Sequence, residues 1–168
     1  MIFVKVKEKS IVGKGIGVFA QEFITKGTLI WKENNDVKKY SQDEYELLNE
    51  EIKKNVYFNG EFYVWTQGYG ESWNHSCDAN TWWIADDELS ARRDIDEGEE
   101  LTYDYATSDL DPKIEYTWEC KCERPTCRKH LKWNDLISYE ALYQEYKGHL
   151  PSYVENYLKD YRFKQSDI

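Results

Sequence analysis

Three of the four cysteines lie in one short segment, and their spacing constrains the fold more than any other feature of this sequence. The pattern C-x-C-x4-C places Cys120, Cys122 and Cys127 close together, and the remaining cysteine is Cys77. Structural zinc takes four ligands in tetrahedral geometry, with thiolate sulfur at about 2.3 Å. Such short spacing is typical of metal ligands, so the sequence predicts an all-cysteine zinc site that ties residues 74–80 to the C-terminal third of the chain. A set of reduced core thiols is the alternative.

The N-terminus bears on whether these cysteines pair as disulfides. Residues 1–7 alternate apolar and charged side chains, which is typical of a strand, and they lack the apolar region and small-residue cleavage site of a secretory signal. Disulfides persist mainly in secreted proteins. We therefore expect an intracellular protein, cytoplasmic or nuclear and chromatin-associated, whose thiols are reduced or bound to metal.

Length and charge limit the function classes. The chain has 168 residues and a mass of 20.1 kDa, which predicts one domain with room for a hydrophobic core. The mean hydropathy is -0.84, and no apolar run approaches the roughly 18 residues that a membrane-spanning helix needs. The 22 basic and 32 acidic residues give a net charge of -10, which disfavours direct binding to nucleic acid and favours a basic partner.

Periodicity predicts a β-rich chain before the C-terminal third. We expect strands near 2–7, 16–21 and 28–32, a helix over 41–55, a hairpin over 56–65, and strands over 81–85 and 88–93. Ser41 and Glu44 form a capping-box signature at the start of the helix. Asn59 and Gly60 predict a two-residue turn in the hairpin, because this pair tolerates positive φ angles.

Beyond Trp133 the pattern becomes helical. Tyrosines recur at spacings of three and four residues, with Gly148 and Pro151 between the two expected helices. The tyrosines concerned are Tyr139, Tyr143, Tyr146, Tyr153, Tyr157 and Tyr161. Such a stripe is more often core packing than a cofactor site, so we assign it to structure.

Three further segments carry residue types suited to chemistry, namely 13–20, 74–80 and 98–105. The glycines of the first segment do not fit the dinucleotide motif G-x-G-x-x-G, and on their own they indicate a tight turn between strands. A lone histidine is usually a hydrogen-bonded structural residue, and Tyr105 is one of 14 tyrosines. Each segment is therefore weak evidence when taken alone.

In their order and separations, these segments and the cysteine pattern resemble the SET-domain protein lysine methyltransferases that carry a cysteine-containing post-SET segment. The resemblance runs from about residue 11 to residue 131. It implies a β-rich α+β protein with the SET (β-clip) fold, in which small sheets surround a knot-like crossing near Asn74 and Tyr105 and C-terminal helices follow. It also implies three regions: a SET domain over 1–118 with an insert over about 41–65, a post-SET zinc segment over 119–133, and a helical extension over 134–168.

The resemblance implies roles for particular residues. Tyr105 falls on the family's catalytic tyrosine, and Tyr103 falls on its phenylalanine/tyrosine switch. The cofactor S-adenosylmethionine is expected to contact Lys14, Gly15, Gly17, Asn74 and His75. Trp118 either covers its adenine or packs in the core. The expected zinc ligands are Cys77, Cys120, Cys122 and Cys127.

The sequence departs from the family pattern in three respects. Ala79 stands where members usually have proline, which costs some turn rigidity. Residues 30–34 lack the tyrosine-containing stretch of many members, so no second active-site tyrosine is assigned there. A cysteine-rich pre-SET region is also missing, which leaves histone specificity open.

The implied activity is methyl transfer from S-adenosylmethionine to a lysine side-chain amine in a protein substrate. Histone tails, ribosomal proteins and other basic proteins suit the acidic charge of the chain. A hydroxyl at Tyr103 can hold a water in the space that a bulkier methylated amine needs, so we expect mainly monomethylation. A catalytically silent SET-fold module that binds peptide or cofactor is the alternative, and a zinc-stabilised interaction protein is the third hypothesis.

Overall fold

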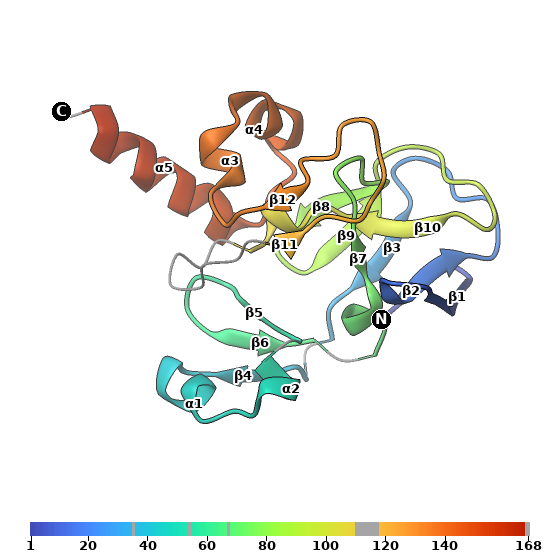
Figure 1. Cartoon of the computed structure of the whole chain (residues 1–168), viewed down its shortest axis with the longest axis horizontal. Coiled ribbons are helices and arrows are strands. Elements are labelled where there is room, and N and C mark those ends of the chain that lie inside the picture. Colours follow the sequence, from blue (N-terminus) through green and yellow to red (C-terminus); the bar gives the residue numbers. More distant parts are fainter. Residues whose placement is uncertain (35, 54, 67, 110–117, 167–168) are drawn as a thin grey trace.

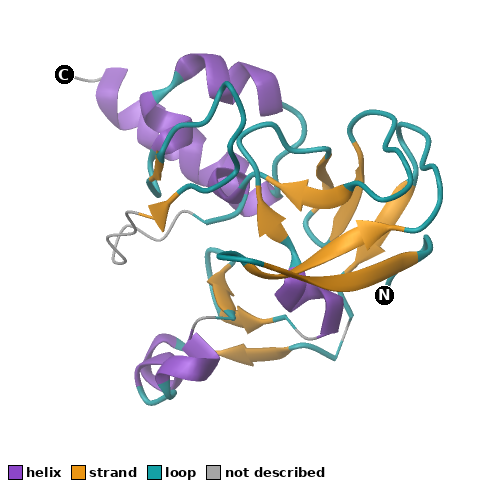
Figure 2. Ribbon diagram, turned by 45° about the vertical axis from the view of Figure 1, so that its right-hand side comes forward, coloured by secondary structure: helices purple, strands orange, loops and turns teal. Residues whose placement is uncertain are grey.

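The computed structural model describes residues 1–34, 36–53, 55–66, 68–109 and 118–166, and for residues 118 and 162–166 it describes the backbone alone. The strands are β1 Val6–Ile11, β2 Gly15–Ala20, β3 Leu29–Lys32, β4 Lys38–Tyr40, β5 Val56–Phe58, β6 Tyr63–Trp65, β7 Asn74–His75, β8 Thr81–Ala85, β9 Glu88–Ala91, β10 Glu100–Tyr103, β11 Trp118–Glu119 and β12 His130–Leu131. The helices are α1 Gln42–Glu46, α2 Glu50–Lys53, α3 Asp135–Ser138, α4 Glu140–Tyr146 and α5 Ser152–Ser166, with 3-10 turns η1 Gly68–Ser72 and η2 Tyr105–Thr107. Helices α3 to α5 gather on one side of the small sheets, and β4 to β6 with α1 and α2 form a separate lobe (Figures 1 and 2).

Two sheets enclose the first hydrophobic core. One has the order β1-β2-β10-β7, in which β10 pairs antiparallel with β2 and parallel with β7. The other has the order β3-β9-β8. Val18, Ile30 and Leu101 are fully buried in this core. The parallel pairing sets residues 74–75 beside 102–103, so two of the predicted motifs lie side by side.

The first expected strand is displaced along the chain. We expected it at 2–7, but β1 begins at Val6 and pairs with β2 as far as Ile11 and Gly15. The residues before it contact β3 instead, since Ile2 bridges Trp31 and the Phe3 amide donates to the Ile30 carbonyl at 2.9 Å. The strands expected near 16–21, 28–32, 81–85 and 88–93 are confirmed to within two residues.

The capping box at Ser41 is confirmed, but the single helix expected over 41–55 is wrong. Ser41 accepts the Glu44 amide and donates its own amide to the Glu44 carboxylate at 2.7 Å. The helix then stops, and the side chain of Asn49 accepts the Ile52 amide at 2.9 Å, which caps a second helix. Leu47 is 88% exposed. No continuous apolar face therefore holds one long helix together.

The hairpin over 56–65 is confirmed, but its two-residue turn is wrong. The last pair of the ladder is Phe58 with Tyr63, which leaves a loop of residues 59–62. The side chain of Asn59 accepts the amides of Glu61 and Phe62 at 3.1 and 2.8 Å, and these bonds stabilise the longer loop. On its other edge β6 pairs with β4, a strand that the sequence pattern did not predict.

The helices expected beyond Trp133 are present and form a second core. Leu136, Tyr146, Val154 and Leu158 are buried there, so the assignment of the tyrosine stripe to packing is confirmed for Tyr146. Tyr143, Tyr153 and Tyr157 are partly buried against the same core. Tyr139 differs, because it is 53% exposed.

This arrangement confirms a β-rich α+β fold of small sheets with C-terminal helices. The knot-like crossing near Asn74 and Tyr105 stays a prediction. Among the described residues, no helix has both the length and the apolar character required to cross a bilayer.

Candidate functional site

The four cysteines meet in one place. Their sulfur atoms all lie within 4.8 Å of one another, and the Sγ atoms of Cys77 and Cys120 are 3.7 Å apart. In a tetrahedral site with metal–sulfur bonds of about 2.3 Å, two sulfurs are separated by about 3.8 Å. In the part of the chain that the structure describes, this is the one group of cysteine, histidine and acidic side chains close enough to share a metal ion. The cluster therefore fits zinc, with Cys122 and Cys127 completing the ligand set.

Backbone amides surround these thiols and favour the negative charge that metal binding requires. The Arg128 amide lies 3.3 Å from Cys77 Sγ, and the Lys129 amide lies 3.4 Å from Cys127 Sγ. Burial raises the pKa of the Cys77 thiol to about 11, although Arg128 opposes this. A bound cation offsets the cost of burial, because metal ligation deprotonates a thiol. The donor set is thus that of a structural site.

Asn74 lies against β2 because residue 17 has no side chain. A Cβ atom on Gly17 would lie 2.5 Å from Glu100 Oε1 and 3.0 Å from Asn74 Nδ2. The Asn74 amide instead donates to the Ile16 carbonyl at 3.0 Å and to Glu100 at 2.7 Å. The structure therefore brings together Gly17 and Asn74, two of the residues predicted to contact the cofactor.

The other predicted cofactor residues lie around this contact. Gly15 has a φ of 91°, which glycine adopts without strain. Lys14 is exposed in the turn between β1 and β2. The Lys121 ammonium donates to the Gly13 carbonyl at 3.4 Å, so the cysteine segment lies beside the same turn. The Trp118 side chain is outside the described residues, and its contact with the cofactor stays a prediction.

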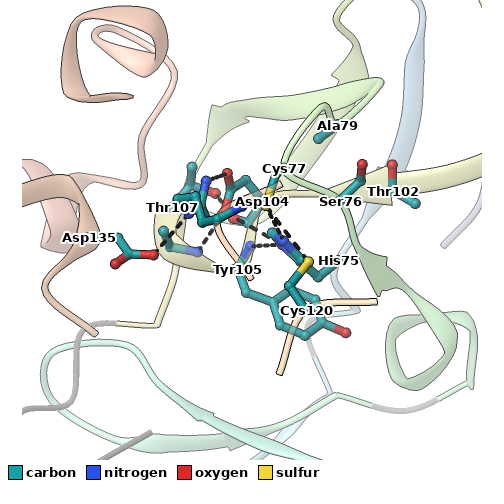
Figure 3. Close-up of polar contacts among 12 residues, drawn as sticks. His75, Ser76, Cys77, Ala79, Thr102, Asp104, Tyr105, Thr107, Cys120 and Asp135 are labelled. Atoms are coloured by element: carbon teal, nitrogen blue, oxygen red, sulfur yellow. Dashed lines mark hydrogen bonds and ion pairs between the residues drawn. The ribbon is translucent and has the colours of Figure 1, made fainter. Parts of the chain in front are cut away.

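His75 connects the thiol cluster to the segment that carries Tyr105 (Figure 3). Its Nδ1 accepts the Tyr105 amide at 3.2 Å, and its Nε2 lies 3.2 Å from Cys77 Sγ. Burial lowers the pKa of His75 to about 4, an effect that Asp104 opposes and Arg128 reinforces. The ring is therefore neutral at pH 7 with its proton on Nε2, and it donates toward the Cys77 sulfur. Such a donor orients a ligating thiolate.

The Tyr105 hydroxyl donates a hydrogen bond to the Trp73 carbonyl at 2.7 Å. The centre of its ring lies 5.3 Å from that of His75 and 5.0 Å from that of Tyr103. Burial, with a further contribution from the charge of Glu100, raises the pKa of Tyr105 well above its ordinary value, and burial raises the pKa of Tyr103 as well. Both hydroxyls are therefore protonated at neutral pH and can donate a hydrogen bond.

A cavity of about 480 Å³ lies beside both tyrosines and is lined by residues of the core and of the 38–66 lobe. Its aromatic lining residues are Trp31, Tyr45, Tyr57, Trp73, Trp83, Tyr103 and Tyr105. Three carboxylates, Glu50, Glu71 and Asp109, line it together with Lys53. Rings contact methylene groups and attract an ammonium group, and carboxylates attract the same charge. The lining therefore suits an alkyl amine.

Sequence reasoning missed several of these residues. Trp31 and Tyr57 both line the cavity, and the Tyr57 hydroxyl donates to Glu33 at 3.1 Å. Trp31 lies in residues 30–34, the stretch in which no active-site tyrosine was assigned. Its aromatic ring was the one signal that could have indicated a cavity-lining residue there. Arg128 was also missed, although it directly follows Cys127.

Comparisons with known proteins bear on the family and the fold of this chain. A family model described as the SET domain matches residues 15–106, more than half of the chain. The methyltransferase domain of human histone-lysine N-methyltransferase SETMAR aligns with a TM-score of 0.61 and 23% identity, over 77% of this chain and 58% of that chain. KRYPTONITE in complex with mCHG DNA and SAH aligns with a TM-score of 0.59 and 22% identity, over 77% of this chain and 29% of that chain. This chain thus spans less than two thirds of either structure, and no curated protein matches it by sequence.

The two structural alignments show a similar fold, and they confirm the SET fold that the motifs imply. The matched range of the family model includes Gly15, Gly17, Asn74, His75, Cys77, Tyr103 and Tyr105. The chain belongs to the SET domain family.

Proposed function

We propose that this protein transfers a methyl group from S-adenosylmethionine to the side-chain amine of a lysine in a protein substrate. The observation that carries the proposal is the aromatic cavity beside Tyr105, whose hydroxyl is held by the Trp73 carbonyl. Membership of the SET family and the likeness to the SETMAR methyltransferase domain support this reaction class.

We assign the cofactor to the surface formed by Lys14, Gly15, Gly17, Asn74 and His75, with Trp118 over the adenine. The residues fit such a group, since a Cβ atom on Gly15 would meet no atom within 4 Å and the exposed Lys14 offers a cation to a carboxylate. The complex of KRYPTONITE with SAH, the demethylated form of the cofactor, supports the assignment. When bound, S-adenosylmethionine supplies a methyl group on a positively charged sulfur.

The substrate lysine must lose a proton before it can accept the methyl group. Its ordinary pKa of about 10.4 makes the neutral amine cost roughly 4 to 5 kcal/mol at pH 7. Rings such as Trp73 and Trp83 exclude water from the amine and thereby disfavour the ammonium form. We assign the protonated hydroxyl of Tyr105 the role of a hydrogen-bond donor or acceptor to the amine. It orients the amine for in-line attack, and alignment of this kind supplies much of the rate.

The lining of the cavity also supports a lysine-bearing, basic protein as substrate. Lys53 shows how an ammonium group is accommodated there, since its Nζ lies 3.2 Å from Glu50 and 5.6 Å from the centre of the Tyr45 ring. Glu71 and Asp109 add negative charge to the same lining. These requirements are met by a histone tail, a ribosomal protein or another basic protein. With such a substrate, the activity belongs in the cytoplasm or on chromatin in the nucleus.

The proposal assigns separate roles to three regions of the chain. Residues 1–118 form the SET domain with an insert at about 41–65, residues 119–133 hold a structural zinc ion together with Cys77, and residues 134–168 form a helical extension. The closeness of the four sulfur atoms supports the zinc site. The contributions of β5 and α2 to the cavity lining support a role of the insert in substrate binding.

Mass spectrometry tests the proposal directly. The zinc-loaded protein is incubated with S-adenosylmethionine and separate pools of core histones and ribosomal proteins, and methylated lysines are mapped. We expect single methyl groups on lysine in one pool, a loss of at least 100-fold in Tyr105→Phe, and no loss in the control Tyr139→Phe, whose side chain is 53% exposed. Cofactor binding by calorimetry without transfer to either pool would instead favour a silent binding module.

A further inference from the structure

A buried ion network links the C-terminal helices to the segment that carries Tyr105. Arg128 donates from Nη1 to Asp104 Oδ2 and from Nη2 to Asp104 Oδ1, each at 2.7 Å. Its Nε donates to Asp135 Oδ2 at 2.9 Å. The side chains of Asp104, Asp135 and Arg128 are only 0%, 1% and 12% exposed. Three charged groups are thus removed from water together.

Each member of the network belongs to a different part of the chain. Asp104 lies between Tyr103 and Tyr105, directly after β10. Arg128 directly follows Cys127, and its amide contacts the Cys77 sulfur at 3.3 Å. Asp135 is the first residue of α3, and Figure 3 shows it on the opposite side of Asp104 from His75. One guanidinium group therefore joins the helices and the cysteine segment to the proposed active site.

Asp104 determines the local conformation of the Tyr105 backbone. Its Oδ1 accepts the Ala106 amide at 3.0 Å and so caps η2. Its carbonyl accepts the hydroxyl of Thr107 at 2.6 Å. The Tyr105 amide is held by His75 at 3.2 Å. The position of the Tyr105 ring therefore depends on where Asp104 is held.

The chemistry of the network suits positioning better than stability. The free-energy cost of removing three charges from water offsets much of their mutual attraction. A buried ion cluster therefore contributes little to the stability of the fold. A bidentate pair between guanidinium and carboxylate fixes orientation as well as distance. Methyl transfer depends on alignment, and a small displacement of an aligning group has a large effect on rate.

We propose that Arg128 and Asp135 are positioning residues through which α3 and the cysteine segment hold Tyr105 in its catalytic position. The proposal rests on the methyl transfer proposed above. It makes the C-terminal helices part of the active-site structure as well as of the second core.

Asp135→Asn is the informative variant. Asparagine keeps the shape of the side chain and an oxygen acceptor for Arg128 Nε, but it removes the charge. Glu145→Gln is the matched control, because it also removes an acidic residue of the C-terminal helices that pairs with an arginine. Glu145 pairs with Arg92 instead of Arg128, and its side chain is 42% exposed.

Two measurements on the zinc-loaded full chain test the proposal. Hydrogen exchange follows the amides of residues 105–107, and steady-state kinetics follow methyl transfer. For Asp135→Asn we expect exchange at least fivefold faster at these amides, a kcat lower by about tenfold, and KM values for cofactor and peptide within twofold of wild type. Glu145→Gln should change none of these. Because Asp135 acts through Tyr105, Asp135→Asn should slow a Tyr105→Phe protein no further.

Other results would overturn the proposal. Unchanged exchange at 105–107 in Asp135→Asn, equal effects in Glu145→Gln, or a defect that adds to that of Tyr105→Phe would each do so. If Asp135→Asn does not fold, Arg128→Lys takes its place, and failure of both variants to fold would show a purely structural network. A wild-type protein without methyl transfer would contradict the proposed function, whereas the exchange measurement would still decide whether α3 holds the Tyr105 segment.

Discussion

Tyr103 and Tyr105 lie two residues apart and line the same cavity, but we assign different tasks to their hydroxyls. Tyr103→Phe keeps the ring that contacts Trp83 edge-on at 5.7 Å. It removes the hydroxyl that we propose holds a water where a second methyl group would lie. One such hydrogen bond contributes about 1 kcal/mol, so peptide mass spectrometry should show a ratio of dimethyl to monomethyl product about fivefold higher. Efficient trimethylation by the wild-type protein would contradict this assignment.

Gly17 is the residue where added volume should harm cofactor binding more than folding. The atoms that a new Cβ would meet are ends of side chains, including Glu100 Oε1 at 2.5 Å and Asn74 Nδ2 at 3.0 Å. These groups can shift at a cost of about 1 to 2 kcal/mol, but Asn74 then loses its place beside β2. We expect Gly17→Ala to weaken the affinity for S-adenosylmethionine about tenfold by calorimetry. The control Gly13→Ala strains the turn that precedes β2 but meets no atom within 4 Å, so an equal loss there would refute the argument.

At the scale of elements, local patterns were predictable and partners distant in sequence were not. The capping box at Ser41 and the hairpin over 56–65 depend on neighbouring residues, and both are present. The start of β1 depends on β3, because residues 2 and 3 pair with that strand instead of extending β1. Strand β4 pairs with β6, although α1, α2 and β5 lie between them in the sequence. Side-chain periodicity within a segment does not contain this information.

The loop of the β5–β6 hairpin offers a test of whether the lobe formed by β4 to β6, α1 and α2 contributes to substrate binding. Asn59→Ala removes the acceptor of two loop amides and should destabilise the protein by about 1 kcal/mol, which lowers Tm by about 2 to 4 °C. Because Tyr57 on β5 lines the cavity, KM for a peptide substrate should rise while cofactor affinity stays constant. The exposed Asn156 on α5 provides the control Asn156→Ala. A loss of cofactor affinity in Asn59→Ala would argue against separate roles for lobe and core.

At the scale of the whole molecule, the sequence predicted which motif residues lie together but not the buried charged residues that connect them. The four cysteines, Gly17 with Asn74, and Tyr103 with Tyr105 come together in the structure as their motifs imply. Arg128 and Asp135 were not predicted, since no spacing rule says which buried charges will meet. Their contacts with Asp104 arise only when β10, the cysteine segment and α3 assemble.

Zinc removal should therefore loosen parts of the chain that contain no cysteine. A structural zinc ion contributes on the order of 10 kcal/mol to the segment that it folds. We expect one zinc per chain by elemental analysis and a fall in Tm of more than 10 °C on chelation, reversed by added zinc. Hydrogen exchange should accelerate in α3 and at residues 105–107, because Arg128 leaves Asp104 and Asp135 when the cysteine segment detaches. Cys122→Ser should reproduce these effects at lower zinc content. Four titratable thiols in a zinc-free protein with an unchanged Tm would instead establish the cysteines as core thiols.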